Sequence, residues 1–466
     1  MRRSRLVVLL ALVSMVSMVG CGGGGSSSSP PPAPGGSAPL SVVVRDTPPA
    51  GVTVLSFEVT VTGAALQPGN VSLVTAPIKI EVKHLEVEAA LLSTLNVPAG
   101  TYTSLSVTLA NPELTIKNDT GSALAGCAAG AVCEIKPAVS GTVTYSGAPF
   151  PITIAANTPI GLLVDVNLND IIQSNLSVSF SAANAIVVSQ LPALQGTGQL
   201  EEIEDLDGIV ANKDATNSQF TLQTTAGNFT VKVDATTEFE DFDEAGCSTA
   251  NFACVQNGQF VEVDLRLIAG GVLLAREVEL EDDAADDELE GIVFSIDSPT
   301  QFKMVILEEL RDVPGIEIGN PVTVTLASNP AFRVDVDGLS APPALQGSFE
   351  GAVDTSQLLA GQSVQVRRLG TSSGTTVNTD RVRLRMSRFT ATVASVAVPN
   401  FIVNGLPSLF TSAGVSQIQV QTSPQTEFEG VSGVSSLASG NTVSLRGLLF
   451  KTGADPVMVA KKVRKR

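Results

Sequence analysis

Short segments in which apolar and polar residues alternate fill the first part of the chain. Clear examples are residues 56–62, 78–82 and 104–109, which turns containing Pro or Gly separate. Alternation with a period of two predicts strands with one buried face, and a series of such strands predicts a sandwich of two sheets. One segment, 86–95, has apolar residues at helical spacing instead. We therefore expect an N-terminal β-sandwich over residues 40–195 that includes one short helix.

The remaining chain repeats one strand pattern three times, over residues 203–282, 288–387 and 388–466. Each copy contains a strand with a phenylalanine and closes on a Gly-Gln-x-Val or Gly-Asn-x-Val strand. The first two copies open with a shared glycine, Gly208 and Gly291, which the third copy lacks. The short alternating segments of each copy are enough to close a small barrel, so we expect three tandem β-barrels. The predicted fold class is therefore all-β.

Both parts of the chain resemble families of uncharacterised domains. Residues 40–48, 59–63 and 91–103 resemble domain of unknown function 4382, and the last segment is also similar to the Pro-x-Gly-Thr-Tyr edge of prealbumin-like and carbohydrate-binding-like sandwiches. The three copies resemble domain of unknown function 5666, which implies small OB-like barrels. These resemblances imply folds and no activity.

The N-terminal residues predict export and lipid attachment. Arginines precede an apolar run over 6–19 that is too short for a stable transmembrane helix. Met-Val-Gly before Cys21 resembles a bacterial lipobox, which implies a signal peptide over 1–20 and acylation of the Cys21 thiol, for example with palmitate. Residues 21–39 are rich in Gly, Ser and Pro, a composition typical of a tether. Because Gly22 follows the cysteine, the resemblance favours the outer membrane or cell surface over the inner membrane.

The charge of the chain is concentrated in one module. The whole chain has a net charge of −18, while residues 201–290 contain 23 of the 46 acids and four bases, a net charge of −19. Because nucleic-acid binding requires positive charge, nucleic acid is not expected as a partner. The expected partners are the membrane, through the lipid anchor, and glycans or proteins of the cell envelope.

The four cysteines other than Cys21 form two close pairs in the sequence, Cys127 with Cys133 and Cys247 with Cys254. We expect two disulfides, which are common in exported proteins. The alternative is a metal site, but the spacing and the lack of a nearby histidine do not fit zinc.

Two charged runs are candidate binding sites. The acidic run 279–290 includes Asp282, Asp283, Asp286 and Asp287, which are the weak candidates for a calcium site because calcium prefers several carboxylate oxygens. The run lacks the spacing of an EF-hand loop, so the favoured alternative is a solvated linker between barrels. Calcium is the one cofactor that the sequence leaves open.

The second run is basic. Arg381, Arg383 and Arg385 share one face of a predicted strand, because side chains two positions apart point to the same side. They either bind an anion of a glycan or lipid, or form a polar strand face that meets the acidic linker. The basic C-terminal run, 461–466, is expected to be a solvated strand end.

Catalytic motifs are scarce. His84 is the one histidine of the chain and has no nucleophile-elbow sequence near it, so a catalytic role is not expected. We expect a cell-envelope lipoprotein that is not an enzyme and that acts in binding, in adhesion or as a scaffold. The alternatives are an envelope hydrolase that uses clustered carboxylates, and a passive structural spacer.

Overall fold

The computed structural model describes residues 37–466 apart from short gaps. The gaps are 48–52, 87–89, 138, 140, 159, 183, 192–201, 225–226, 243–245, 269–271, 282–286, 310–312, 314, 337 and 454. Cys21 and most of the expected tether lie outside the described residues. Strands make up 57% of the structure and helices 7%, which confirms the all-β class. Within the described part of the chain, no helix has the length and apolar character needed to cross a membrane.

The N-terminal unit is a sandwich of two sheets. The first sheet has the strand order β12-β11-β1-β5, in which β1 and β11 are parallel. Its strands are β1 (Ser37–Thr47), β5 (Ala90–Pro98), β11 (Ile160–Asn167) and β12 (Ile186–Leu191). The second sheet is built around the long antiparallel pair β2 and β7. Its strands are β2 (Thr53–Gln67), β3 (Val71–Ser72), β4 (Ile78–Glu81), β7 (Ser104–Lys117), β8 (Val132–Ile135) and β9 (Gly141–Tyr145).

Apolar side chains from both sheets form one core, because alternate residues of each strand face the opposite sheet. Val42 and Leu162 of the first sheet pack in the same cluster as Phe57 and Leu114 of the second. Two further strands, β6 (Gly100–Tyr102) and β10 (Ile152–Ile154), pair at the end of the sandwich. A 3-10 turn, η1 (Val82–Glu86), and a short helix, α1 (Leu168–Ile171), complete the unit.

The prediction of a helix over residues 86–95 is wrong. Residues Ala90–Pro98 form β5, which pairs antiparallel with β1 and places Leu95 opposite Leu40. Short apolar runs fit both helical and strand spacing, and here pairing with the neighbouring strand decides the outcome. The buried side chains of Leu92 and Val97 belong to the sandwich core as strand residues.

Three barrels with the same strand connections follow the sandwich. If the five main strands of each barrel are numbered in chain order, their order around the barrel is 1-2-3-5-4, and strand 4 pairs with strand 1. The pair between strands 3 and 5 is parallel. This is the connectivity of a small OB-like barrel. Barrel 1 consists of β13 (Glu202–Asp214), β14 (Gln219–Thr224), β15 (Gly227–Lys232), β17 (Phe260–Ile268) and β18 (Val272–Leu280), with the short β16 (Glu238–Glu240) beside β18.

Barrels 2 and 3 repeat this plan. Barrel 2 consists of β19 (Asp287–Ser298), β20 (Gln301–Glu309), β21 (Pro321–Val334), β22 (Ser363–Arg368) and β23 (Thr376–Ala397), with α2 (Pro343–Glu350) and η3 (Thr355–Gln357) between β21 and β22. Barrel 3 consists of β23, β24 (Asn400–Asn404), β25 (Ile418–Gln421), β27 (Thr442–Phe450) and β28 (Val457–Lys465), with α3 (Ser408–Ser412), β26 (Glu427–Glu429) and η4 (Val434–Ser436) in its connections.

Barrels 2 and 3 share one strand. β23 is 22 residues long and acts as the last strand of barrel 2 and the first strand of barrel 3. Its even-numbered residues Val382 and Leu384 lie in the core of barrel 2, whereas its odd-numbered residues Phe389 and Val393 lie in the core of barrel 3. Because side chains alternate between the faces of a strand, the two barrels lie on opposite faces of β23.

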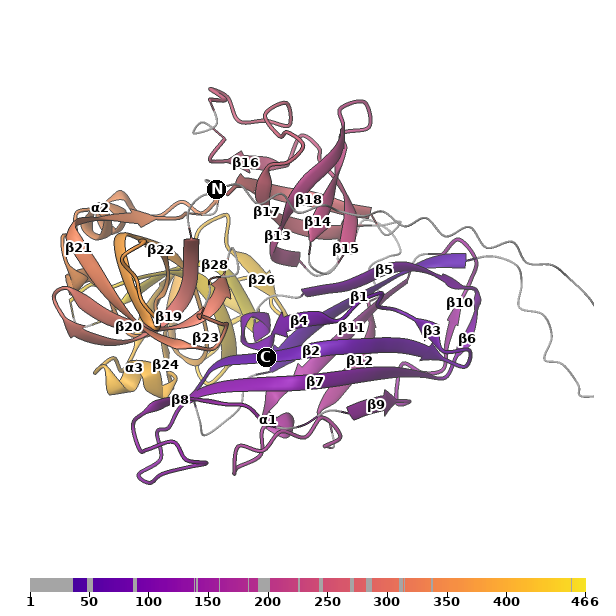
Figure 1. Ribbon diagram of the computed structural model, residues 1–466, viewed down its shortest axis with the longest axis horizontal. Helices are drawn as coiled ribbons and strands as arrows, with labels where there is room; N and C mark the ends of the chain where they lie inside the picture. Colours follow the sequence, from indigo (N-terminus) through magenta and orange to yellow (C-terminus); the bar gives the residue numbers. More distant parts are fainter. Residues whose placement is uncertain are drawn as a thin grey trace, which may run out of the picture.

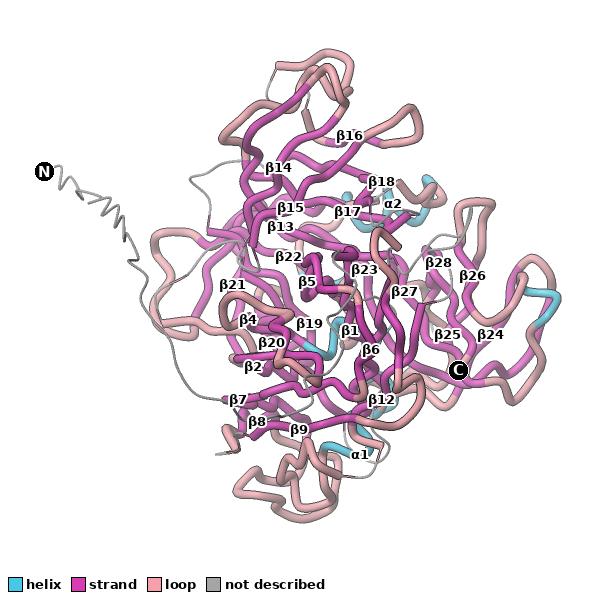
Figure 2. Tube along the Cα trace, turned by 90° about the vertical axis from the view of Figure 1, so that its right-hand side faces the viewer, coloured by secondary structure: helices cyan, strands magenta, loops and turns pink. Residues whose placement is uncertain are grey.

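The four units pack against one another (Figure 1). The sandwich is drawn in indigo and magenta, barrel 1 lies above it, and barrels 2 and 3 lie beside both in orange and yellow. Leu55 of the sandwich forms a small apolar cluster with Val305 and Ala360 of barrel 2 and Leu409 of α3. In the view turned by 90°, β14 and β16 of barrel 1 lie at the top and β7 and β9 of the sandwich lie toward the bottom (Figure 2).

The opening glycine of barrel 2 is required by a close contact between strands. A Cβ atom on Gly291 would overlap the carbonyl oxygen of Val305 in the neighbouring strand β20. We predict that Gly291→Ala lowers the free energy of unfolding by about 1–3 kcal/mol, the usual cost of overpacking. Thermal unfolding followed by circular dichroism measures the change. Gly370→Ala is the matched control, since Gly370 has no atom within 4 Å of such a Cβ. Equal midpoints for the two variants would contradict the explanation.

Candidate functional site

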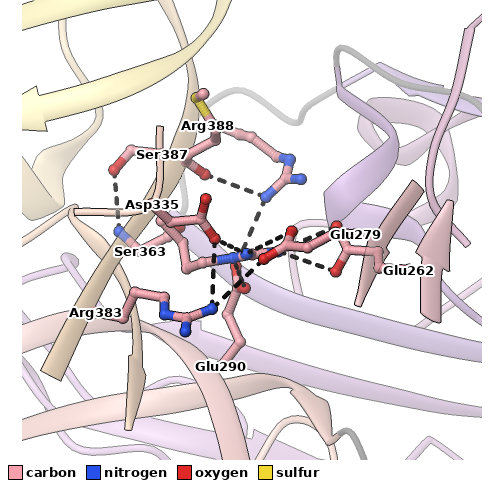
Figure 3. A network of polar contacts seen from close by, with 10 residues as sticks. Glu262, Glu279, Glu290, Asp335, Ser363, Arg383, Ser387 and Arg388 are labelled. Carbon is pink, nitrogen blue, oxygen red and sulfur yellow. Dashed lines mark hydrogen bonds and ion pairs between the residues drawn. The ribbon is translucent and has the colours of Figure 1, made fainter. Parts of the chain in front are cut away.

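The most distinctive polar site is a cluster of buried charges between the barrels, centred on Arg385 of β23. Figure 3 labels the surrounding residues, among them Glu262, Glu290 and Asp335. The Arg385 side chain is 8% exposed. Its Nε donates to Glu290 at 3.0 Å, and one terminal nitrogen donates to Glu262 at 3.0 Å. The other terminal nitrogen donates to Asp335. The guanidinium group of a buried arginine is therefore surrounded by carboxylates, as its five donors require.

The carboxylates come from strands of two barrels. Glu262 of β17 and Glu279 of β18 belong to barrel 1, and both flanking residues of each, two valines for Glu262 and Val278 and Leu280 for Glu279, lie in the core of that barrel. Both carboxylates therefore point away from the interior of barrel 1, yet both residues are buried. Glu290 of β19 belongs to barrel 2, as does Asp335, whose backbone N–H donates to the carbonyl oxygen of Leu384 at 3.1 Å. The outer face of barrel 1 is thus covered by the arginines of barrel 2.

Further ion pairs surround this centre. Arg383 lies 3.6 Å from Glu279 and 3.9 Å from Asp335, and Arg381 pairs with Glu288. All three arginines that the sequence singled out are thus engaged with carboxylates of the same chain. Three of those carboxylates, Glu279, Glu288 and Glu290, belong to the acidic run 279–290.

Arg388 extends the cluster toward barrel 3. It lies on the other face of β23 and donates to the carbonyl oxygen of Met386 at 3.2 Å, while its guanidinium lies 3.8 Å from Glu290. Beside it, the backbone N–H of Ser363 donates to the hydroxyl of Ser387 at 3.0 Å. The cluster therefore continues up to the junction between barrels 2 and 3.

Barrel 1 meets barrel 3 through a second set of ion pairs. Glu427 of β26 accepts from Arg266 of β17 at 3.2 Å and from Arg276 of β18 at 3.1 Å. The basic strand β28 is also buried here: Lys461 is 2% exposed, and Lys462 and Arg464 are each 5% exposed. The expectation of a solvated C-terminal strand end is wrong for these three residues, because neighbouring elements cover the outer face of β28. Arg464, for example, lies 3.2 Å from Glu429 of β26.

Burial determines the protonation of the cluster. Burial, followed by the nearby Asp335 carboxylate, raises the pKa of Glu279 well above its ordinary value, although Arg385 acts in the opposite direction. The pKa of Glu281 is also raised, again mainly by burial. Burial alone would lower the pKa of Arg385, but Asp335, Glu262 and Glu290 outweigh it and raise this pKa further. The arginine therefore stays charged, while Glu279 holds a proton more tightly than a carboxyl group in water.

Of the expected calcium ligands, only Asp287 lies within the described residues. Asp282, Asp283 and Asp286 lie outside the described residues, and Asp287 begins β19, where its backbone pairs with Arg368. A different set of carboxylates, those of Glu238, Glu240 and Glu277, comes close enough to hold a cation. The ammonium group of Lys461 lies near this set. Both it and the Glu238 carboxylate surround Gly338: a Cβ atom added there would lie 3.7 Å from Lys461 Nζ and 2.8 Å from the Glu238 carboxylate. The side chain of His84 is not among those that the structure describes.

Both cysteine pairs form disulfides, Cys127 with Cys133 and Cys247 with Cys254. The first closes the connection between β7 and β8, and the second lies in the connection between β16 and β17. The expected disulfides are therefore present, and these four thiols are not zinc ligands.

Sequence reasoning identified the arginines but missed the shared strand and the lysines of β28. A signal for the shared strand exists, because residues 376–397 contain neither Gly nor Pro. A continuous strand without a turn residue cannot end one barrel and begin a separate one. The lysines gave no such signal, since their burial depends on β26 and barrel 1.

Comparison with known proteins supports the repeat interpretation. Residues 207–279 and 391–464, which lie in barrels 1 and 3, match the family described as Domain of unknown function (DUF5666). The match does not extend to barrel 2, in which α2 and η3 lengthen the connection between β21 and β22. No curated protein matches the chain.

Among solved structures, a multidomain protein with nucleic acid binding domains from Streptococcus pneumoniae TIGR4 is similar over 54% of this chain and 71% of that chain. The two are 10% identical and superpose with a TM-score of 0.11.

We predict that Arg385→Met lowers the free energy of unfolding by about 3–5 kcal/mol, because it removes the nearest counter-charge of the buried carboxylates of Glu262, Glu290 and Asp335. Chemical denaturation measures the loss. Arg333→Met is the matched control: Arg333 is exposed and, among the described residues, donates to the carbonyl oxygen of Phe332 at 3.0 Å. A comparable loss in both variants would show that the cluster is not the cause.

Whereas loss of Arg385 should destabilise the protein, the raised pKa of Glu279 predicts that loss of its charge is tolerated or stabilising. A carboxyl group whose pKa is higher in the folded state binds its proton more tightly when folded, so its contribution to stability falls as pH rises. We therefore expect Glu279→Gln to be at least as stable as the natural protein at pH 8. The advantage should shrink as pH falls toward the ordinary carboxyl value of 4.5. Denaturation at several pH values tests this, and an advantage that grows toward acid pH would contradict it.

Proposed function

We propose that this chain is an exported, lipid-anchored protein of the cell envelope whose β-units act together as one rigid, non-catalytic binding or scaffold module. The lipobox-like sequence before Cys21 and the tether-like composition of residues 21–39 support the anchor. The two disulfides support an oxidising compartment, since disulfides rarely persist in the cytosol. The first residue after the anchor, Gly22, favours the outer membrane or the cell surface.

The observation that carries the rigid-module proposal is the burial of Arg385 among carboxylates of two barrels. Independent barrels on flexible linkers would keep these charges in water, because removing an ion from water is costly unless it is paired. The shared strand β23, which joins barrels 2 and 3, and the apolar contact around Leu55, which joins the sandwich to them, also favour a rigid module. A body of this kind holds its outer surfaces at fixed positions relative to one another, which suits a protein that presents binding sites away from a membrane.

The binding part of the proposal can be separated from a purely structural role. Purified protein would be incubated with isolated envelope glycans and with detergent-solubilised envelope proteins. Saturable capture of one component supports a binding module. No saturable capture from either fraction would contradict it and favour a spacer.

We predict that Cys21→Ser abolishes labelling of the protein by radioactive palmitate in a Gram-negative host and moves the protein from the membrane fraction to the soluble exported fraction. The reason is that the serine hydroxyl does not replace the thiol that the lipobox resemblance assigns to acylation. The double variant Cys127→Ser/Cys133→Ser is the matched control, since it also removes cysteines but should keep the label. Retention of the label in the Cys21 variant, or an uncleaved protein in the cytosol, would refute the anchor.

A further inference from the structure

A cavity of about 850 Å³ lies where the sandwich, barrel 2 and barrel 3 meet. Its size falls within the range of about 300–1,000 Å³ that is typical of small-molecule sites. All three units contribute to its lining, so the cavity exists only in the assembled chain. Representative lining residues are Lys117 and Val132 of the sandwich, Phe294 and Lys303 of barrel 2, and Leu409 and Lys451 of barrel 3.

The charge of the lining is opposite to that of the whole chain. Each unit contributes one lysine: Lys117 at the end of β7, Lys303 in β20 and Lys451 after β27. The described residues that line the cavity include no Asp or Glu. In a chain with a net charge of −18, the lining thus carries three positive charges, two of which pair with carboxylates outside the lining, those of Asp119 and Asp297. A ligand carboxylate would compete with these partners for the ammonium groups and would be the natural partner of the remaining positive charge.

The three ammonium groups are held in place by contacts within the protein. Lys117 lies 3.1 Å from Asp119 and donates to the hydroxyl of Ser412 at 2.6 Å. Lys303 lies 3.0 Å from Asp297, and Lys451 donates to the carbonyl oxygen of Leu358 at 3.2 Å. An ammonium group has three donors, and these contacts use one or two of them. Each ammonium group therefore keeps at least one N–H that these contacts do not use.

The rest of the lining is largely apolar. Leu358, Leu359 and Leu409 are buried, and Phe294 is half-buried. Ile296 is 38% exposed, which makes it one of the few large apolar side chains exposed in the described structure. An aliphatic chain placed here would cover apolar surface that water now contacts, and this burial would favour binding.

We propose that the cavity binds an anionic amphiphile, a carboxylate attached to an aliphatic chain. The carboxylate contacts the lysines, and the chain packs on Phe294 and Ile296. The proposal deepens the binding role proposed above by naming a ligand class. It does not depend on the lipid anchor, so loss of acylation at Cys21 would leave it standing.

Decanoate is the probe for this site. The full chain carrying Cys21→Ser is titrated with decanoate in a calorimeter. Decyltrimethylammonium, which has the same chain length and a positive head, should bind at least about tenfold more weakly, a difference of about 1.4 kcal/mol. Equal affinity for the two compounds, or no detectable binding of decanoate, would overturn the proposal.

A pair of variants tests the lysines. Lys303→Met/Lys451→Met keeps the aliphatic stems and removes two charges, and it should weaken decanoate binding about tenfold or more. Lys232→Met is the control, because Lys232 is exposed and does not line the cavity. Thermal unfolding verifies that both variants are folded. Unchanged affinity in the cavity variant, or an equal loss in the control, would show that the lysines do not bind the carboxylate.

Discussion

A guanidinium group that is removed from water must be surrounded by acceptors, and this requirement at Arg385 organises the arrangement of the barrels. Glu262 approaches it from barrel 1, and Glu290 and Asp335 approach it from barrel 2. The cost of desolvating these groups is large, and their mutual attraction offsets it only when the geometry is complete. Barrel 1 therefore has one favourable position relative to barrel 2, since a shift between them would leave charges buried without partners.

The shared strand fixes the other junction in a different way. Because β23 passes from barrel 2 into barrel 3 without a turn, the relative orientation of these barrels follows from the geometry of one strand. Leu448 and Phe450 of β27 belong to the core of barrel 2, so a strand of barrel 3 contributes side chains to both cores. Covalent continuity and apolar packing join barrels 2 and 3, whereas ionic contacts join barrel 1 to both.

Strand periodicity predicted a large part of this architecture. It predicted an all-β chain, and it placed Arg381, Arg383 and Arg385 on one face of a strand, because both depend on neighbouring residues only. It could not identify what that face contacts, since Glu262 is 123 positions from Arg385 in the sequence. The prediction of a helix over 86–95 was wrong for a related reason. Pairing with β1, a strand from the start of the sandwich, decides the structure of this segment. Long-range pairing therefore accounts for both the unpredicted partners and the incorrect helix.

Charged contacts between barrels also solve a problem that repeated domains create. Barrels of the same topology can associate with the wrong neighbour during folding, because their apolar surfaces are alike. Barrel 1 presents a patch of Glu262, Glu277 and Glu279 on β17 and β18, which meets the arginines of β23 and the basic residues of β28. Next to this patch the signs are reversed, since Arg266 and Arg276 of barrel 1 meet Glu427 of barrel 3. Two copies of the acidic patch would repel each other, so the pattern disfavours incorrect pairing as well as favouring the correct one. An apolar interface of similar size could be more stable, but it would not distinguish between the barrels. On this argument the main contribution of the buried charges is to specify which face meets which.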